Sequence, residues 1–507
     1  MTGVRSRPLV HRRDLDKGQK YRRDRKEKPV KVVPVRFVQA CTRGHVSDID
    51  WQVFVHGNED QCRRNLWLDE KGTTGDLTDI IVRCECGKSK ALSATTKMKD
   101  APLGYCNGPR PWLGNYAREK CGGADDKRQI NRLLIRSASN AYFAQTLSVI
   151  SIPEAGGKLR DAVDEVWADY LQYCESAADV AKERRKAKVS AALEAQTDGD
   201  VWAEVQRRKG GGAPAVRGIR EAELETLMQS GEDIGEDQPE GLFCARSVRI
   251  PGREPDLTAP ISRVVKVHRL REVIAQIGFT RFEAAVPDVN GELALEVERA
   301  ALALNQSWLP AVENRGEGVF VGFKTSAIDA WMKRSGVNAR GLQLLAGFNA
   351  WQKAHQGSTA KFPGLPYVML HTLSHLLITA VALDCGYAAS SIRERIYVGD
   401  SGYGILLYTA SPDAEGTLGG LVQAADRLDR YLRQAVDLGG LCSNDPVCAQ
   451  HEADNTQEDR LLLGAACHGC VLLAESSCER RNDFLDRALV VPTVDRTGTA
   501  FFDVDES

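Results

Sequence analysis

The sequence lacks any apolar run close to the roughly 20 residues that a membrane-spanning helix needs, and no apolar segment of a secretory signal follows its basic first residues. It also lacks an excess of charge of either sign, since 67 Lys and Arg residues stand against 69 Asp and Glu residues. The first two absences predict a cytoplasmic protein with no membrane partner. The third excludes a chain that binds nucleic acid through overall positive charge, so contact with DNA must come from a local basic patch or a partner protein.

A nucleotide-binding phosphate loop is also missing. Residues 318–326, GVFVGFKTS, come nearest to one, but their glycines are too closely spaced and the lysine does not directly follow the second glycine. The G-x-x-x-x-G-K-[ST] spacing is what lets the backbone amides and the lysine reach the same phosphates. The sequence therefore predicts a protein that is not itself an ATP-hydrolysing enzyme.

Two histidines have the spacing of a zinc protease motif without its catalytic residue. His371 and His375 are four residues apart in an apolar segment predicted to be helical, but Thr372 stands where that motif places its glutamate base. We therefore interpret the pair as hydrogen-bonded histidines of a packed helix. The alternative is a metal-dependent nuclease or hydrolase that uses His371 and His375 with Glu394 or Asp413.

Length and composition predict a multi-domain chain with a mixed α/β (α+β) architecture. The chain has 507 residues, of which 43% are hydrophobic and 27% charged, enough for several buried cores. Composition shifts along the chain suggest five segments, and zinc stabilisation of two of them follows from the cysteines discussed next. The segments are a basic, disordered arm at 1–30, a cysteine-rich domain at 31–153, a helical region with a Gly-rich and acidic mobile segment at 154–249, a mixed α/β domain at 250–360 and a second cysteine-rich domain at 361–507.

Periodic apolar residues predict several helices and strands within these segments. Three- and four-residue steps from Leu159 to Tyr173 indicate one buried helix face. The last domain reads as a helix, two strands, a glycine-rich turn at 409–420 and an amphipathic helix. Backbone amides of that turn either bind an anion such as phosphate or simply allow strand and helix to pack closely.

Five of the fourteen cysteines crowd into the last domain. Thiols stay reduced in the cytoplasm, which favours metal binding over disulfides. A structural zinc site needs four soft ligands in a tetrahedron, and two pairs separated by short loops supply them. The predicted ligands are Cys442, Cys448, Cys467 and Cys470. A redox-active dithiol at Cys467 and Cys470 is the alternative, and Cys478 remains as a reserve ligand or a buried thiol.

Eight further candidate ligands occur in the N-terminal domain, enough for two tetrahedral sites. The partition that we predict places Cys84, Cys86, Cys106 and Cys121 at one zinc ion, and Cys41, His45, His56 and Cys62 at another. In the CxC spacing of CECG only one of the two sulfurs is expected to reach a metal, and either histidine can instead be a hydrogen-bonded core residue. On this interpretation both terminal domains are zinc-stabilised and a helical insertion separates them.

Several motifs occur in the same order as in known proteins. Near the C-terminus the sequence contains LHTLSHLLI, SIRERIYVGDSGYGILLYTASPDAEGTLGG, CSNDPVC and ACHGCVLLAESSCERRNDFLDR. Together they resemble the helicase-associated, four-cysteine zinc domain that follows DNA helicase cores. The N-terminal part contains VRFVQACTRGHVSDIDWQVFVHG, CNGPRPWLGNY and SASNAYF. These segments are similar to the DrmB family of subunits of DISARM, a bacterial defence system against phage. The resemblance covers residues 31–153 and 361–490.

The resemblance implies a non-catalytic partner of a superfamily-two helicase, the DrmA subunit, in a complex that engages DNA. It also implies a structural zinc ion at the four C-terminal cysteines already named. The CECG segment departs from the commoner CxxC form, which puts the ligands of the N-terminal unit in question.

Basic residues of the N-terminal arm are the candidate DNA contacts, because contacts with phosphates dominate the affinity of proteins for DNA. They are Arg12, Arg13, Arg22 and Arg23. A zinc-stabilised adaptor with no role at DNA is the remaining alternative.

Overall fold

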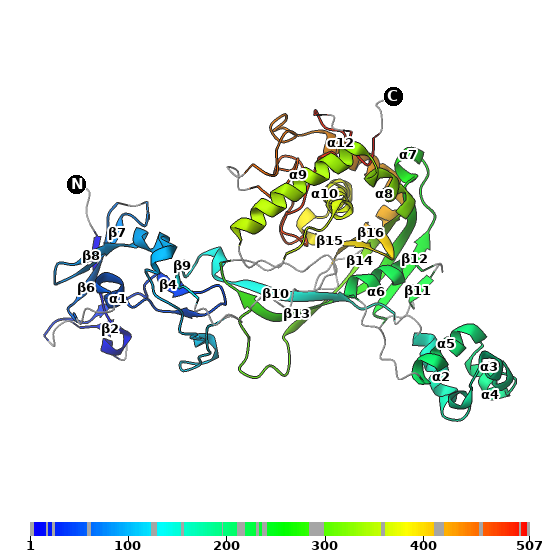
Figure 1. Ribbon diagram of the computed structural model, residues 1–507, viewed down its shortest axis with the longest axis horizontal. Helices are drawn as coiled ribbons and strands as arrows, with labels where there is room; N and C mark the ends of the chain where they lie inside the picture. The colour runs from blue at the N-terminus through cyan, green and yellow to red at the C-terminus, as the bar shows by residue number, and fades with distance from the viewer. Residues whose placement is uncertain are drawn as a thin grey trace. The chain divides into compact units, whose positions relative to one another are not determined.

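The structure is a computed structural model (Figure 1), and it describes residues 5–16, 19–22, 26–57, 62–72, 74–122, 129–153, 157–194, 196–209, 218–229, 233–235, 241–282, 299–355, 360–409, 420–455, 460–495 and 498–503. The chain forms two compact units. The N-terminal unit contains Met1–Thr146, Gln276–Val286 and Leu295–Pro310, and the C-terminal unit contains Leu147–Ala275, Pro287–Ala294 and Ala311–Ser507. Outside the described residues lie Arg23, Asp413, the turn at 410–419 and most of the Gly-rich and acidic segment.

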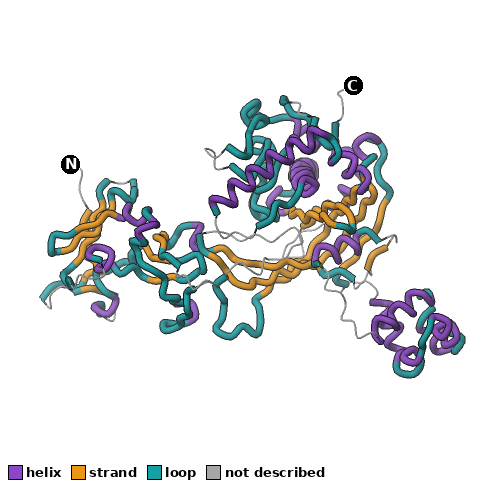
Figure 2. The backbone as a smooth tube through the Cα atoms, viewed as in Figure 1, coloured by secondary structure: helices purple, strands orange, loops and turns teal. Residues whose placement is uncertain are grey.

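Small antiparallel sheets build the described part of the N-terminal unit (Figure 2). One has the strand order β1–β6–β7–β8, another the order β5–β4–β9, and β2 pairs with β3. Alternate residues of β6 and β7 are buried with Phe37 and Phe54, so each strand has one core face. The bounds are β1 Arg5–Leu9, β2 Lys20–Tyr21, β3 Val30–Lys31, β4 Phe37–Ala40, β5 Val46–Ser47, α1 Trp51–His56, β6 Leu66–Glu70, β7 Ile80–Cys84, β8 Ser89–Ala91 and β9 Arg132–Ile135, with 3-10 helices η1 Arg12–Asp14, η2 Leu92–Thr96, η3 Met98–Asp100, η4 Pro111–Leu113 and η5 Ser139–Ala141.

The prediction of a disordered arm over residues 1–30 is wrong for residues 5–9. These residues form β1, which pairs antiparallel with β6 from Arg5 opposite Glu70 to Leu9 opposite Leu66. The low apolar content of the segment suggested disorder, but an edge strand is held by backbone hydrogen bonds to its neighbour and needs few apolar side chains of its own.

A larger antiparallel sheet organises the C-terminal unit, with the order β11–β12–β13–β14–β16–β15, and β10 also pairs with β13. The segments SRVVKVHRL and GVFVGF lie in β13 and β14, which confirms that they are strands. Most positions of β15 and all but one of β16 are buried, because helices cover both faces of the sheet. The bounds are β10 Phe143–Ile150, β11 Asp233–Gly235, β12 Phe243–Val248, β13 Ile261–Thr280, β14 Ala311–Phe323, β15 Ile392–Gly399 and β16 Gly402–Thr409.

The central helix of this unit is α10 (Leu365–Cys385), which packs against β15, β16 and the amphipathic helix α12 (Leu428–Gly440). Contrary to the expectation from sequence, α10 is long and apolar enough to cross a membrane by length and composition alone. However, 72% of its most apolar window is buried inside the protein, which explains why it is apolar on all sides. The surrounding helices are α6 Ile219–Leu227, α7 Pro255–Thr258, α8 Thr325–Met332, α9 Ser335–Ala354, α11 Gly420–Gln423, and the 3-10 helices η7 Ala389–Ser391, η9 Ala424–Arg427 and η10 Arg487–Leu489.

A group of short helices with its own core lies between residues 157 and 209. The single helix face predicted from Leu159 to Tyr173 is shorter than expected. Helix α2 ends at Trp167, and the side chain of Tyr173 is 71% exposed. The core is instead closed by Val180, Val189 and further apolar residues of the later helices. The bounds are α2 Gly157–Trp167, η6 Leu171–Tyr173, α3 Ala177–Glu183, α4 Ala187–Ala192 and α5 Asp198–Lys209.

The C-terminal unit does not divide at residues 249/250 or 360/361, where composition suggested domain boundaries. Strands from all three predicted segments belong to one sheet, with β12 before residue 249, β13 and β14 in the middle, and β15 and β16 after residue 360. Composition reflects local sequence, whereas strand pairing joins residues far apart in the chain. The composition shifts therefore did not reveal that the three segments share one sheet.

A buried ion pair fixes α6 to this sheet. The guanidinium group of Arg395 on β15 donates to both carboxylate oxygens of Glu223 on α6, at 2.7 and 2.6 Å, and both residues are 1% exposed. The Tyr397 hydroxyl also donates to Glu223, at 3.0 Å, and the carbonyl oxygen of Ser148 accepts from Arg395 at 2.9 Å. Every charge is therefore matched by hydrogen bonds, the condition under which such a pair is tolerated in a core.

We predict that Glu223→Gln destabilises the C-terminal unit by about 3–5 kcal/mol, because it removes the carboxylate that accepts two hydrogen bonds from the buried Arg395. The remaining carboxylate, that of Glu272, is 3.8 Å from Arg395 and is shared with Arg393. The matched control is Asp233→Asn, which breaks the pair between Asp233 and Arg246, at 2.7 Å, whose side chains are 65% and 62% exposed. Its expected effect is below about 1 kcal/mol. Urea unfolding of the full chain measures both, and equal effects would contradict the prediction.

Candidate metal centres

The loops that follow α12 bring four cysteine sulfurs together. The sulfur atoms of Cys442 and Cys467 are 3.5 Å apart, those of Cys467 and Cys470 are 3.6 Å apart, and those of Cys448 and Cys470 are 3.8 Å apart. A tetrahedral ion with zinc–sulfur bonds of about 2.3 Å separates its sulfurs by about 3.8 Å, whereas a disulfide needs about 2.05 Å. The donor set therefore fits a zinc ion, and Cys442, Cys448, Cys467 and Cys470 are the residues that would hold it.

Backbone and side-chain amides prepare these sulfurs to carry negative charge. The amide of Asn444 donates to the sulfur of Cys442 at 3.4 Å, and the amide of Gly469 donates to that of Cys467 at 3.3 Å. Burial raises the pKa of Cys467, but hydrogen bonds from the Asn444 side chain and from Gly469 outweigh it and lower that pKa to about 7. Burial and the neighbouring sulfur raise the pKa of Cys442 to about 11. Four thiolates so close together need a bound cation to balance them.

A buried arginine joins these loops to the core. The side chain of Arg487 is fully buried, forms an ion pair with Asp445 and donates to the carbonyl oxygen of Gly439 at 3.0 Å. Asp445 lies between two of the cysteines, and Gly439 belongs to the last turn of α12. The metal-binding loops are therefore held against the helix by a charge that also interacts with the sulfur of Cys448.

The N-terminal unit contains two clusters, but they divide the eight predicted ligands differently from the predicted partition. One cluster consists of Cys41, His45, Cys106 and Cys121, and the other of His56, Cys62, Cys84 and Cys86. The partition was wrong because Cys84 and Cys86 lie with His56 and Cys62, whereas Cys106 and Cys121 lie with Cys41 and His45. Both CxC sulfurs belong to one cluster, contrary to the expectation that only one would reach a metal, since Cys84 ends β7 and Cys86 lies in the turn to β8. Sequence spacing did not reveal which distant loops face each other.

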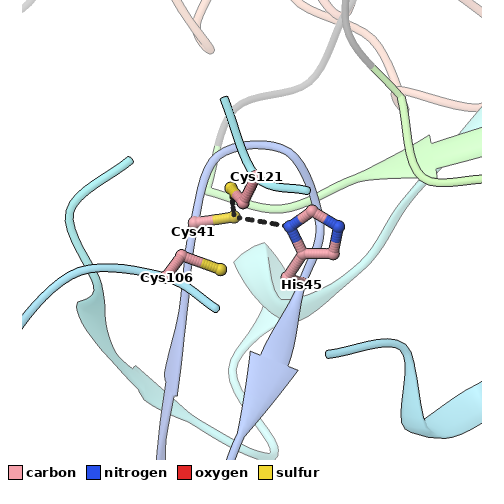
Figure 3. Close-up of side chains that lie close together, drawn as sticks. All are labelled: Cys41, His45, Cys106 and Cys121. Atoms are coloured by element: carbon pink, nitrogen blue, oxygen red, sulfur yellow. Dashed lines mark hydrogen bonds between the residues drawn. The ribbon is translucent and has the colours of Figure 1, made fainter. Parts of the chain in front are cut away.

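The first of these clusters is buried and begins with Cys41, the residue after β4. Figure 3 shows its four side chains directed toward one another. The sulfur of Cys41 is 3.8 Å from that of Cys121 and 3.3 Å from Nδ1 of His45. On the other side of the ring, Nε2 of His45 is 2.6 Å from a carboxylate oxygen of Glu119, which pairs with Arg110 at 3.0 Å. A carboxylate that accepts the Nε2–H proton leaves Nδ1 with a free lone pair toward the sulfurs, the usual arrangement behind a metal-binding histidine.

The second cluster is built on the end of α1. The sulfurs of Cys62 and Cys84 are 3.7 Å apart, and Nε2 of His56 is 3.2 Å from the sulfur of Cys86. The Nδ1 atom of His56 lies 3.0 Å from the carbonyl oxygen of Gln52, so Nδ1 carries the proton and Nε2 is available to a metal. A hydrogen bond from the Lys88 amide, together with the contact with the His56 ring, lowers the pKa of Cys86 to about 6. Both N-terminal clusters therefore fit zinc with three sulfurs and one nitrogen.

Three of the four arginines predicted to contact DNA are described, and they belong to a hairpin near the N-terminus, apart from the cysteines in sequence. Arg12 and Arg13 are exposed on η1, and Arg13 lies 3.8 Å from Asp14. A bridge between Leu15 and Tyr21 turns the chain back, so the exposed Arg22 follows at the same end of the hairpin as η1.

The nuclease alternative has no accessible site among the described residues. The side chains of His371 and His375 are fully buried, and that of Glu394 is 3% exposed. A polynucleotide cannot reach them without opening the core.

Comparison with known proteins agrees with these donor sets. Residues 373–471 match the MrfA Zn-binding domain, and residues 4–143 match a domain of unknown function (DUF8724). The chain is also similar to the DISARM protein DrmB of Bacillus paralicheniformis, with 32% identity over 489 residues that span 93% of this chain and 83% of the relative. The chain belongs to the DrmB family. Zinc is thus the cofactor of this DrmB-family chain, whose four C-terminal cysteines all lie within residues 373–471.

For this DrmB-family chain, we predict that Cys467→Ser removes one equivalent of zinc and lowers the unfolding temperature of the C-terminal unit. Structural zinc supplies about 10–16 kcal/mol of folding free energy in zinc-finger peptides. The control is Cys385→Ser, since Cys385 contacts the Tyr431 hydroxyl and belongs to none of the clusters. Metal analysis and calorimetry measure the effect, and a Cys467→Ser protein with unchanged zinc and melting would contradict it.

The two N-terminal clusters can be told apart by the reactivity of their thiols. In Cys106→Ser we expect Cys41 and Cys121 to become reactive to an alkylating reagent, while Cys84 and Cys86 stay protected by their own ion. Peptide mass spectrometry after brief alkylation identifies the modified cysteines. The reciprocal variant, Cys84→Ser, should expose Cys62 and Cys86 instead. If Cys106→Ser exposed Cys84 and Cys86, the arrangement of the clusters would be refuted.

Proposed function

We propose that this chain is a non-catalytic, zinc-stabilised subunit of a DISARM antiphage defence complex, which binds a superfamily-two helicase subunit and helps it to engage DNA. The observation that carries the proposal is the similarity to the DISARM protein DrmB along 93% of the chain. Because that similarity includes both units, it supports a shared role for the whole chain and not only for its zinc domain.

The charge distribution supports a contact with DNA through the N-terminal unit. Between residues 1 and 146, Lys and Arg residues outnumber Asp and Glu residues by 29 to 17, whereas the rest of the chain has 38 against 52. The near-zero net charge of the whole chain therefore hides a basic N-terminal part. The exposed Arg5 and Arg7 of β1 add to the exposed arginines of the η1 hairpin. Such a surface binds phosphates without regard to sequence.

The structure around GVFVGFKTS supports the view that a partner supplies ATP hydrolysis. Gly318 and Gly322 lie inside β14, where the backbone amides are engaged in the sheet and do not form a loop around a phosphate. Lys324 follows the strand, and its Nζ atom donates to the carbonyl oxygen of Ala259 at 2.6 Å. These residues therefore form part of the sheet and stabilise its end, which agrees with a subunit that acts on DNA through a helicase.

Co-purification tests the helicase contact. When this chain is co-expressed with a DrmA-like helicase subunit and captured by a tag on either protein, we expect both to elute as one complex in size-exclusion chromatography. Adding nuclease before capture separates a direct protein contact from tethering by DNA. Separate elution of two folded proteins would contradict the proposed partner.

The DNA contact is tested by removing charge from the η1 hairpin. We predict that the triple variant Arg12→Gln, Arg13→Gln and Arg22→Gln weakens binding of the complex to a short duplex and lowers the salt dependence, by about one unit of slope for each phosphate that is no longer neutralised. The matched control replaces three exposed lysines of the C-terminal unit by glutamine. They are Lys333, Lys353 and Lys361.

Fluorescence anisotropy over a series of salt concentrations measures both triple variants. If the two variants have the same affinity and slope as the parent complex, these arginines do not contact DNA. If the control weakens binding as much as the arginine variant does, the effect is one of net charge and not of this hairpin.

A further inference from the structure

A fourth cluster of metal-ligand side chains lies in the core of the C-terminal unit, apart from the four cysteines of the zinc domain. His371 and His375 are one turn apart on α10, Glu394 is on β15, and Cys478 is in the loop beyond the zinc domain. Their ligand atoms all lie within 4.8 Å of one another. Both imidazoles are 0% exposed, Glu394 is 3% exposed and Cys478 is 7% exposed, so water has little access to the cluster.

The hydrogen bonds of the two imidazoles determine which nitrogens face the cluster as lone pairs. The Nδ1 atom of His371 lies 3.2 Å from the carbonyl oxygen of Phe484, and that of His375 lies 2.7 Å from the carbonyl oxygen of Val471. A carbonyl oxygen can only accept, so both Nδ1 atoms carry the proton. In the neutral imidazoles both Nε2 atoms are then unprotonated. This is the arrangement that positions histidine ligands at metal sites.

These two nitrogens point at a group that offers them no hydrogen. A carboxylate oxygen of Glu394 lies 2.9 Å from Nε2 of His371 and 3.4 Å from Nε2 of His375. The Nε2 atom of His375 is buried and has no hydrogen-bond partner among the residues that the structure describes. Lone pairs facing a carboxylate repel it, and burial makes that repulsion stronger. A cation between them turns the same contacts into attractions.

Cys478 has the same backbone environment as the cysteines of the zinc domain. Its sulfur accepts from the amide of Arg480, two residues later, at 3.3 Å, and from the amide of Asn482 at 3.1 Å. The i+2 amide also donates to the sulfurs of Cys442 and Cys467. The sulfur of Cys478 lies 3.1 Å from Nε2 of His371. A sulfur atom that accepts from two amides is therefore directed at the same point as the two imidazoles.

Glu394 is likewise fixed in place from behind. One of its oxygens accepts from the amide of Glu479 at 3.1 Å, and the other accepts from the Ser374 hydroxyl. Because these donors anchor the carboxylate independently of the histidines, its position does not depend on protonated imidazoles. Two neutral imidazoles, one carboxylate and one thiolate carry a total charge of −2, which a divalent cation cancels. A neutral, closed assembly is what a fully buried site requires.

We propose that His371, His375, Glu394 and Cys478 form a second metal site of the C-terminal unit, which binds one divalent transition-metal ion, zinc by preference. Mixed nitrogen, oxygen and sulfur donors in a set of four suit tetrahedral zinc. Four protein ligands and near-complete burial leave no position for water or substrate, so the ion is structural. It joins α10, β15 and the C-terminal loop. Of the four ligands, His371 and Cys478 lie outside residues 373–471, the segment that matches the known zinc domain.

The new site contacts the four-cysteine cluster through the backbone. The carbonyl oxygen that accepts from His375 belongs to Val471, the residue after Cys470. The ion at the four cysteines therefore fixes the acceptor that holds His375 in its ligating tautomer. The two sites stiffen the same loop from both ends, between Cys470 and Cys478.

The metal content of the full chain tests the site. Purified parent protein is expected to contain one zinc equivalent more than Cys478→Ala or His375→Gln, measured by inductively coupled plasma mass spectrometry against amino-acid analysis. The control Cys174→Ala changes a cysteine that is also buried, at 1% exposure, but lies in the helical core at residues 157–209. It should keep the parent content. Variants that fold and retain the parent zinc content would overturn the proposal.

A spectroscopic measurement on the parent protein covers the case in which both variants fail to fold. In protein expressed with cadmium-113, each site gives its own resonance, and thiolate-rich sites resonate far downfield. We expect one additional resonance well upfield of the others, because three of its four ligands are nitrogen or oxygen. Resonances from thiolate-rich sites alone would overturn the proposal and indicate that both histidines are protonated beside Glu394.

Discussion

The metal-binding loops depend on one electrostatic constraint, which is that several thiolates share a small volume. In each of the three cysteine-rich clusters the nearest sulfurs are 3.5–3.8 Å apart, so they repel once ionised. Amides directed at the sulfurs reduce the repulsion but do not remove it. A bound cation turns this mutual repulsion into the attraction that closes each loop. At the four C-terminal cysteines, four thiolates and one divalent ion leave a net negative charge, and the buried Arg487 balances part of that charge.

The rest of the C-terminal unit is stabilised mainly by apolar packing, because apolar side chains cover both faces of its sheet. The core around α10 covers one face of the sheet, and the core around α6 covers the other. Charged side chains in this interior include matched pairs, such as Arg395 with Glu223. The unit thus combines an apolar framework, which determines its shape, with buried polar groups that determine how its helices and loops are attached.

Sequence predicted the elements with local signals and missed those that depend on pairing at a distance. The helix at α10, strands β15 and β16 and the meeting of the four C-terminal cysteines followed from periodicity and short spacings. The way in which the eight N-terminal ligands divide between two clusters could not be predicted, since it depends on which loops lie beside the ends of β4 and β7. Strand β1 was missed because its partner is 57 or more residues away. Glu394 was grouped with His371 and His375 only in the hydrolase alternative, and Cys478 had no spacing signal relative to His371, from which it is separated by 107 residues.

The burial of the cluster at Glu394 has a consequence for biosynthesis. Its first histidine leaves the ribosome 107 residues before its cysteine, and the finished core admits almost no solvent to the ligands. An ion must therefore be captured while the last part of the chain is still folding. Chains made during metal starvation would close without it, and later addition of zinc would repair them only as fast as the core opens.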